Sequence, residues 1–207
     1  MLTVALSLLG VVGPCPDLPL RVGTVWVYSA AVSWTDSRSQ NVRDTTLTWR
    51  TEVLSVSDSA DARIAVVRNW PTALAWWEPS KLPDTTRILC VGDKVYHMDR
   101  ESIRAPIDDD LLFSFPLATE KLYGRNPKDR DDTFYAWYVE SAIPADSAMV
   151  RMGAQRRDSA FTISYRSLPD HQILVFVRGL GIVEYTYGHH GTVANARARL
   201  VEFSRRP

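Results

Sequence analysis

Four histidines and two acidic clusters are the side chains of this chain that could hold a metal ion. Adjacent residues of a strand point to opposite faces, so His189 and His190 could share one metal only from a turn. Residues 188–191 have the composition of a turn, and we interpret both histidines as polar turn residues. The other two, His97 and His171, stand alone in the sequence.

The acidic clusters do not have the spacing of a calcium site. Calcium takes about six to eight oxygen ligands, and neither cluster matches the EF-hand or the glycine-rich nonapeptide pattern. Runs of charge are commonly solvated loops, and we predict that for both. The sequence therefore predicts no metal and no cofactor. The clusters are Asp108, Asp109 and Asp110, and Asp129, Asp131 and Asp132.

No set of residues indicates nucleophilic catalysis. Neither a G-x-S-x-G nor an S-x-x-K motif is present, and Cys90 lies in an alternating, strand-like run. P-loop and dinucleotide fingerprints are absent as well. Glu140 and Glu184 could pair in space, but the sequence does not fix the separation that glycoside hydrolysis needs. We predict no catalytic residues and a protein that is not an enzyme.

Trp76 and Trp77 are the strongest candidates for a binding site. They lie in residues 71–84, PTALAWWEPSKLPD, a stretch with three prolines that cannot join a central strand. Tryptophan side chains in such loops often anchor protein interfaces or ligands. The alternative is that both fold back and cap one end of the domain, since tryptophan is highly buried on average.

The elements that position these residues are predicted to be β-strands. In TVWVYSAAVSW, the side chains of Trp26, Tyr28, Ala30, Val32 and Trp34 share one face, the period-2 pattern of a half-buried strand. Helical periodicity is hard to find after the N-terminus. Strands are expected near residues 24–34, 44–57, 63–70, 86–91, 94–98, 111–115, 121–123, 134–141, 148–152, 160–167, 172–178, 181–188 and 196–203.

About eleven to thirteen short strands predict an all-β fold, an antiparallel meander with few short helices. We expect the meander to curl into an open or closed β-barrel, with a β-sandwich as the alternative. The alternation blurs near Val53 and Leu54, which predicts a β-bulge there. Residues 71–84 should form a loop or short helical turn between the third and fourth strands.

Composition fits one globular domain, predicted at residues 18–207. Lysine plus arginine and aspartate plus glutamate are balanced at 24 each, so no net field attracts nucleic acid. We predict no nucleic-acid partner.

Residues 1–17 are predicted to be a signal-like or anchor segment. The apolar run at residues 2–12 is about as long as a secretory core and too short to span a bilayer. Cys15 stands where a bacterial lipoprotein carries its lipid, although Pro14 departs from the usual small residue. In an oxidising compartment Cys15 could instead pair with Cys90, but a buried, inert Cys90 is the favoured interpretation.

Two segments carry a resemblance to known proteins. LPLRVGTVWVY at residues 18–28 resembles the opening strand of uncharacterised bacterial secreted and lipoprotein families, with the pattern P-L-x-x-G-x-x-W-x-Y. GLGIVEYTYGHHGT at residues 179–192 is similar to the closing hairpin of those families. The resemblance implies an envelope β-domain in the periplasm or on the outer face of the envelope, and supplies no site residues.

Three functions follow from these features. The leading hypothesis is a non-catalytic envelope module, membrane-associated through its N-terminus, that binds a protein partner or serves as an accessory subunit. The alternative is a carrier or chaperone for a lipophilic ligand, which a core filled by Trp26, Trp34, Trp49 and Trp137 would exclude. The third is a hydrolase whose carboxylates or histidines converge in one cleft.

Overall fold

The computed structural model describes residues 15, 17–59, 61–80, 82–102, 104–124 and 132–205. The predicted signal-like run at residues 1–14 lies outside the described residues. So does most of the polar loop at 124–132, with Asp129 and Asp131 of the second acidic cluster.

The described chain forms one antiparallel sheet of twelve strands, which confirms the all-β prediction. The strands are β1 (Val25–Thr35), β2 (Val42–Asp58), β3 (Ala62–Arg68), β4 (Thr85–Val91), β5 (Lys94–Asp99), β6 (Leu111–Ser114), β7 (Leu122–Gly124), β8 (Ala136–Pro144), β9 (Ser159–Arg166), β10 (Asp170–Val177), β11 (Gly181–His189) and β12 (Ala194–Ser204). Two 3-10 turns, η1 (Pro71–Leu74) and η2 (Asp108–Asp110), and one short helix, α1 (Ser147–Arg151), complete the described elements.

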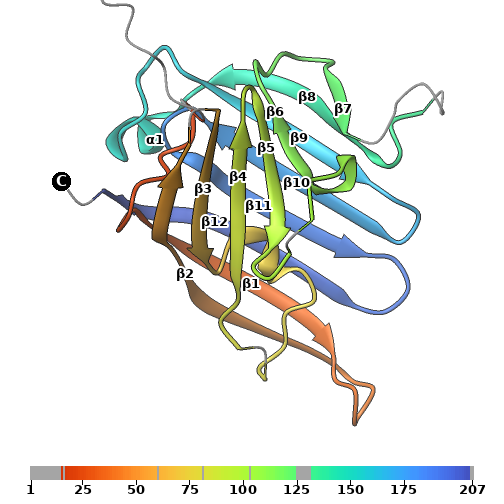
Figure 1. Ribbon diagram of the computed structural model, residues 1–207. Coiled ribbons are helices and arrows are strands. Elements are labelled where there is room, and N and C mark those ends of the chain that lie inside the picture. Colours follow the sequence, from red (N-terminus) through yellow and green to blue (C-terminus); the bar gives the residue numbers. More distant parts are fainter. Residues whose placement is uncertain are drawn as a thin grey trace, which may run out of the picture.

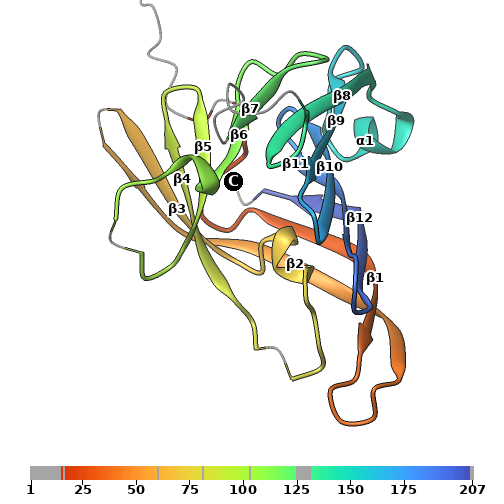
Figure 2. The ribbon, with the colours of Figure 1, turned by 90° about the vertical axis from the view of Figure 1, so that its right-hand side faces the viewer.

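The sheet is a meander in which the first strand also pairs with the last. Its order is β6-β5-β4-β3-β2-β1-β12-β11-β10-β9-β8-β7. Figure 1 shows β3 to β6 passing in front of β8 to β12, and Figure 2 shows these two groups as facing walls. The sheet is therefore curled on itself, a nearly closed barrel.

Within the described residues, side chains and not a backbone ladder join the two edges of the sheet. The indole Nε1 of Trp137 donates a hydrogen bond to the carbonyl of Leu111 at 2.8 Å. The Tyr123 hydroxyl donates to the carbonyl of Leu112 at 3.1 Å. Because Leu111 and Leu112 lie on β6, and their partners on β8 and β7, these bonds hold the barrel nearly closed.

The inner face of β1 forms the middle of the core, as the period-2 pattern predicts. Trp26, Tyr28, Ala30 and Val32 are all buried. The polar ends of the two aromatic side chains are satisfied: Trp26 Nε1 donates to the Leu180 carbonyl at 2.5 Å, and Tyr28 donates to Ile182 at 2.8 Å. The expected bulge is present where β2 pairs with β3, between Val53 and Ser55.

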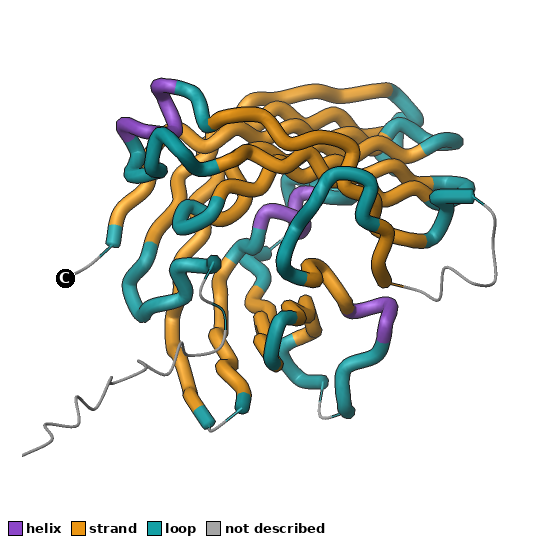
Figure 3. The backbone as a smooth tube through the Cα atoms, turned by 90° about the horizontal axis from the view of Figure 1, so that it is seen from above, coloured by secondary structure: helices purple, strands orange, loops and turns teal. Residues whose placement is uncertain are grey.

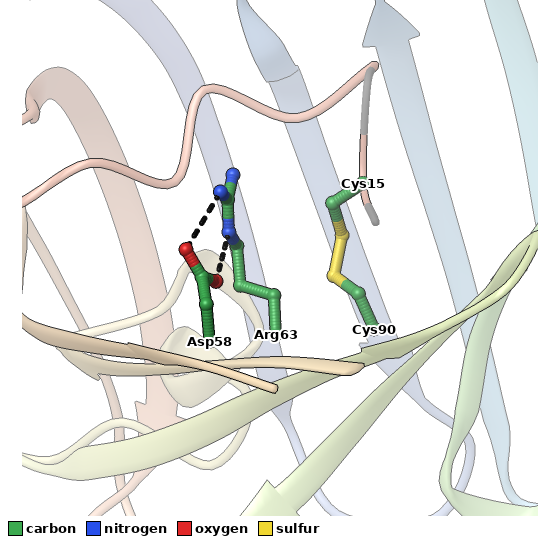
Figure 4. The surroundings of a disulfide bond; sticks show 4 residues. All are labelled: Cys15, Asp58, Arg63 and Cys90. Carbon is green, nitrogen blue, oxygen red and sulfur yellow. Dashed lines mark hydrogen bonds and ion pairs between the residues drawn. A yellow bond between two sulfur atoms is a disulfide. The ribbon is translucent and has the colours of Figure 1, made fainter. Parts of the chain in front are cut away.

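The segment before β1 packs into one end of the barrel. Cys15 and Leu20 are buried, and Cys15 forms a disulfide with Cys90 on β4, with Cα atoms 5.7 Å apart. Figure 4 shows this bond beside the ion pair of Asp58 and Arg63. Cys90 is buried as expected, but the interpretation that it is an inert thiol is wrong. Cys15 and Asp17 are both buried against the domain.

One predicted strand is a helix. Residues 148–152 are predicted to be a strand, yet residues 147–151 form α1, because the Asp146 side chain accepts a hydrogen bond from the Met149 amide at 2.8 Å. This N-cap satisfies an amide that a helix would otherwise leave unpaired. Figure 3 shows the helices and loops as connections around the layers of strands.

Candidate binding site at one end of the barrel

Residues 71–84, which we call the tryptophan loop, are fastened to the barrel at Asn69. The Asn69 amide donates to the Asp84 carbonyl at 2.7 Å, and the Asp84 amide donates to Asn69 Oδ1 at 3.0 Å. The Asn69 carbonyl accepts from Trp49 Nε1 at 2.9 Å and from the Thr51 hydroxyl at 2.6 Å. The first end of the loop is therefore tied to β2, and the two ends are tied to each other.

The conformation of Asn69 explains its residue type. Its φ of 52° lies in the left-handed region, which asparagine tolerates better than most residues. The turn η1 follows at once and lies between the two walls of the barrel, drawn in yellow in Figure 2.

Trp76 is held half-exposed by a strained backbone. Its φ is 55°, a conformation that bulky side chains seldom adopt, and 51% of its surface is accessible. The indole packs on the His189 ring, with centroids 4.4 Å apart, and near the Tyr187 ring at 6.1 Å. Strained residues of this kind persist only where the surroundings fix them, and they cluster at binding sites.

Asp170 orders the rings beneath Trp76. Its Oδ1 accepts a hydrogen bond from the Tyr187 hydroxyl at 2.6 Å and lies 3.0 Å from His189 Nδ1. Burial, together with the bond to Asp170, raises the pKa of the Tyr187 phenol well above its usual value. The phenol therefore stays a donor, and the support for Trp76 is fixed before any partner arrives.

Trp77 lies inward beside Trp34, with ring centroids 5.3 Å apart and planes nearly perpendicular. It is partly buried against the core, the position expected for a residue that caps the barrel. A pocket of about 240 Å³ opens here, and its walls include Trp34, Trp76, Trp77 and Glu78. The two adjacent tryptophans thus have different surroundings.

A second cavity of about 320 Å³ lies inside the same end of the barrel, beneath η1. Polar groups from opposite walls meet in it. The cavity is lined by Thr72, Ala75, His97, Asp109, Asp110, Leu111, Leu112, Trp137, Tyr165 and Gln172.

His97 presents an uncharged ring to this cavity. Burial lowers the pKa of its imidazole, and Asp99, Asp84 and Asp110 only partly oppose that effect. The Asp110 carboxylate is occupied by Arg104, with Nη2 to Oδ1 at 2.7 Å. Within the described part of the chain, no three histidine, cysteine or acidic side chains are placed to hold a metal.

The other residues considered for chemistry lie apart. Glu140 on β8 pairs with Arg166 at 3.0 Å, and Glu184 on β11 pairs with Arg199 at 3.4 Å. Three inter-strand steps of about 4.8 Å separate β8 from β11, so the two carboxylates are on the order of 14 Å apart across the sheet. Only His97 among the histidines lines the cavity with acidic residues.

Several residues of the site were missed from the sequence, although a signal for them existed. Period 2 from the buried Leu174 and Phe176 places Gln172 on the inner face of β10, and period 2 from Val95 does the same for His97 on β5. The turn-like composition of residues 188–191 led us to interpret His189 as a turn residue, whereas it is the last residue of β11 and its ring packs on Trp76. Asn69 has no comparable signal beyond its turn propensity.

Among the described residues, no helix has the length and apolar character that crossing a membrane requires. No family model matches the chain. No curated protein matches it either.

Solved structures that resemble the chain distantly include two bacterial proteins. A predicted lipoprotein from Parabacteroides distasonis superposes with a TM-score of 0.46 and 12% identity, covering 91% of this chain and 98% of that one. A predicted exported protein with a YmcC-like fold from Bacteroides fragilis gives a TM-score of 0.44 and 7% identity, covering 93% of this chain and 100% of its own. Likeness at this level does not extend to function.

Proposed function

We propose that this protein is a non-catalytic binding module of the cell envelope that holds a protein partner through the tryptophan loop. The observation that carries the proposal is Trp76, a large apolar side chain kept half-exposed in a left-handed backbone conformation. Folding alone does not explain such a position, since turning the indole inward would bury more apolar surface.

The site has the properties of a protein-binding hot spot. Tryptophan is enriched at such spots, and its rigid ring loses little conformational entropy on binding. Here the ring is already supported by His189 and Asp170, so binding need not order it. Leu82 of the same loop is 81% exposed and adds a second apolar contact.

Two features support the envelope as the compartment. The Cys15–Cys90 disulfide is of a kind that persists in oxidising compartments and is rare in the cytosol. The apolar run at residues 2–12 has the length of a secretory core. Lipidation of Cys15 would need the sulfur that forms the disulfide, so it remains a prediction for molecules in which that bond is open.

A carrier of lipophilic ligands is the weaker proposal. Trp26, Trp49 and Trp137 are buried and fill much of the barrel. The cavity that remains, about 320 Å³, is lined by as many polar as apolar side chains. That volume lies near the lower end of the range for small-molecule pockets, about 300–1,000 Å³.

The proposal is tested by comparing tagged wild type with Trp76→Ala, after cross-linking in the native host and purification from the envelope fraction. We expect specific proteins to be recovered with wild type and depleted about tenfold or more with the variant, in line with a hot-spot loss above about 1.4 kcal/mol. Val201→Ala removes an exposed apolar side chain on β12 and is the matched control. Equal recovery with all three chains, or a purely cytoplasmic protein, would contradict the proposal.

A further inference from the structure

The pocket of about 240 Å³ beside Trp76 has three indole rings in its walls. The rings of Trp34 and Trp77 meet at 77° with centroids 5.3 Å apart, so they form a corner and not a flat stack. Trp76 adds a third ring, which packs on His189 yet keeps 51% of its surface accessible. The face of an indole attracts cations, because the ring quadrupole is negative there. The pocket therefore offers ring surface of the kind that binds a cation.

A carboxylate lies in the same pocket. Among the described residues that line it, Glu78 is the only charged one. The Glu78 side chain is exposed, accepts a hydrogen bond from the Ser80 hydroxyl at 3.0 Å and forms no ion pair with any described residue. Gln40, also in the lining, donates to the Ser37 carbonyl at 3.0 Å and keeps its Oε1 as an acceptor. Glu78 and Gln40 thus provide acceptors for a ligand that carries N–H donors.

Two basic residues near the pocket have acidic neighbours of their own. His189 lies 3.0 Å from the carboxylate of Asp170. Hydrogen bonds from Ser39 and, to a smaller extent, the charge of Arg43 on β2 lower the pKa of the Asp36 carboxyl. The carboxylate in the lining of the pocket is therefore left for an incoming cation.

The strand side of the pocket is fixed before anything binds. The Thr35 amide donates to the Val193 carbonyl at 2.8 Å, and the Val193 amide donates to the Thr35 hydroxyl at 3.1 Å. These bonds extend the ladder of β1 and β12 to the pocket, where Trp34 pairs with Ala194. A preformed wall lowers the entropic cost of binding.

This combination of rings and a carboxylate selects among possible occupants. An apolar side chain would cover the rings but would remove the Glu78 carboxylate from water without giving it a partner. A quaternary ammonium, such as the choline of a lipid, has no N–H group to donate to that carboxylate, and the ammonium of lysine is a strongly hydrated point charge. A guanidinium is planar, stacks on aromatic faces and matches a carboxylate with two N–H groups. The volume lies below the range of small-molecule pockets, about 300–1,000 Å³, which suits a single side chain.

We propose that this pocket receives an arginine side chain of the protein partner, with the guanidinium packed against the indole rings and paired with Glu78. The inference rests on the proposed function, since it names the group that the partner presents to the tryptophan loop. Arginine and tryptophan are both enriched at hot spots, and the hot spots of two partners tend to pair. The partner therefore exposes an arginine where it meets Trp76.

The test is titration of the purified chain, with its disulfide intact, with N-acetylarginine amide, followed by the NMR signals of the indole N–H groups. We expect saturable shifts of the Trp34, Trp76 and Trp77 signals, with a Kd of about 10 mM or below. N-acetylcitrulline amide has nearly the same shape but no charge, and it should bind about fivefold more weakly or less. N-acetyllysine amide and phosphatidylcholine vesicles are the comparisons for an ammonium and for a lipid head group.

Two glutamates provide a matched pair of variants. Glu78→Gln removes the charge and keeps an acceptor for Ser80, so it should weaken binding of the arginine probe about threefold or more. Glu202→Gln makes the same change at an exposed position on β12, outside the lining, and should leave binding unchanged. Trp76→Leu keeps an apolar side chain but removes the ring, and should also weaken the arginine probe about threefold or more.

Three outcomes of the titrations would overturn the arginine assignment. They are no saturable shift of the indole signals up to about 100 mM of the arginine probe, equal or tighter binding of the citrulline probe, the lysine probe or the vesicles, and equal effects of Glu78→Gln and Glu202→Gln.

Recovery of cross-linked partners separates this inference from the proposed function. Glu78→Gln should deplete the same proteins as Trp76→Ala. Depletion by Trp76→Ala alone would overturn the arginine assignment and leave the tryptophan loop as a protein contact. Full recovery with Trp76→Ala, while the arginine probe still binds, would overturn the proposed function and leave the guanidinium site in place.

Discussion

The indole of Trp76 packs on the imidazole of His189 with ring centroids 4.4 Å apart, so a loop between the third and fourth strands is anchored on the eleventh. Asp170 on β10 holds the same imidazole at 3.0 Å. The contact joins the two walls of the barrel at the end where both pockets lie. Binding at Trp76 is therefore built on the tertiary fold and not on the loop alone.

The two adjacent tryptophans should differ in their contributions to stability. Trp76→Ala removes a side chain that is half in solvent, so we expect a loss of less than about 1 kcal/mol in the free energy of unfolding. Trp77→Ala removes the packing partner of Trp34, with an expected loss of about 2–3 kcal/mol. Urea unfolding of both variants measures the difference. Equal losses would show that Trp76 has a structural role.

Asn69 should be the residue that holds the tryptophan loop to the barrel. Asn69→Ala removes the side-chain bonds to Asp84 and Arg50 and places alanine at a positive φ, so we expect a loss of about 1–3 kcal/mol. Hydrogen exchange should rise in residues 71–84 more than in β11. Asn41→Ala, at an exposed position between β1 and β2, is the control. Unchanged hydrogen exchange in the tryptophan loop of Asn69→Ala would contradict the role assigned to Asn69.

The disulfide should stabilise the domain substantially. Cys15 and Cys90 close a loop with a sequence separation of 75, which corresponds to about 4 kcal/mol in the chain-entropy description. Unfolding of wild type with and without reductant, beside the double variant Cys15→Ser and Cys90→Ser, measures this. An identical midpoint in all three would indicate that the bond does not form.

Intact mass of the protein from its native host distinguishes the two uses of Cys15. A disulfide lowers the mass of the chain by two hydrogens, whereas lipidation adds acyl groups and leaves Cys90 as a free thiol.

Stability should fall as the pH drops below about 6.5, the pKa of histidine in an unfolded chain. Burial lowers the pKa of His97 in the folded state, so the unfolded chain binds more protons between the two values. The contribution of His97 to the free energy of unfolding is therefore complete above about pH 6.5. It declines as the pH falls toward the pKa of His97 in the folded state. The carboxylates with lowered pKa values, such as those of Asp58 and Asp110, change the stability only near or below about pH 4.

Thermal unfolding of wild type and His97→Gln, measured between about pH 7.5 and pH 5, checks this. The variant should lose less stability than wild type across the window. His190→Gln changes an exposed turn residue and should behave like wild type. A steeper pH dependence in His97→Gln would contradict the explanation.

The alternation of apolar and polar residues was enough to predict most strands, because it indicates which face of a strand is buried. It placed Trp26 and Tyr28 in the core, the bulge after Val53, and residues 71–84 outside the ladder. It failed at residues 147–151, where the Asp146 cap begins a short helix in place of the predicted strand. The contacts of Trp76 with His189, and of Cys15 with Cys90, join positions far apart in the chain, and only the curl of the sheet brings them together.

The central claim, that Trp76 is a contact for a protein partner, is tested most directly by photo-cross-linking in living cells. A benzophenone amino acid is placed at position 76 and, as the control, at position 201, which is also exposed but lies on β12. The account predicts a discrete, light-dependent adduct with an envelope protein from position 76 and none from position 201. No adduct at position 76, or the same adducts from both positions, would contradict it.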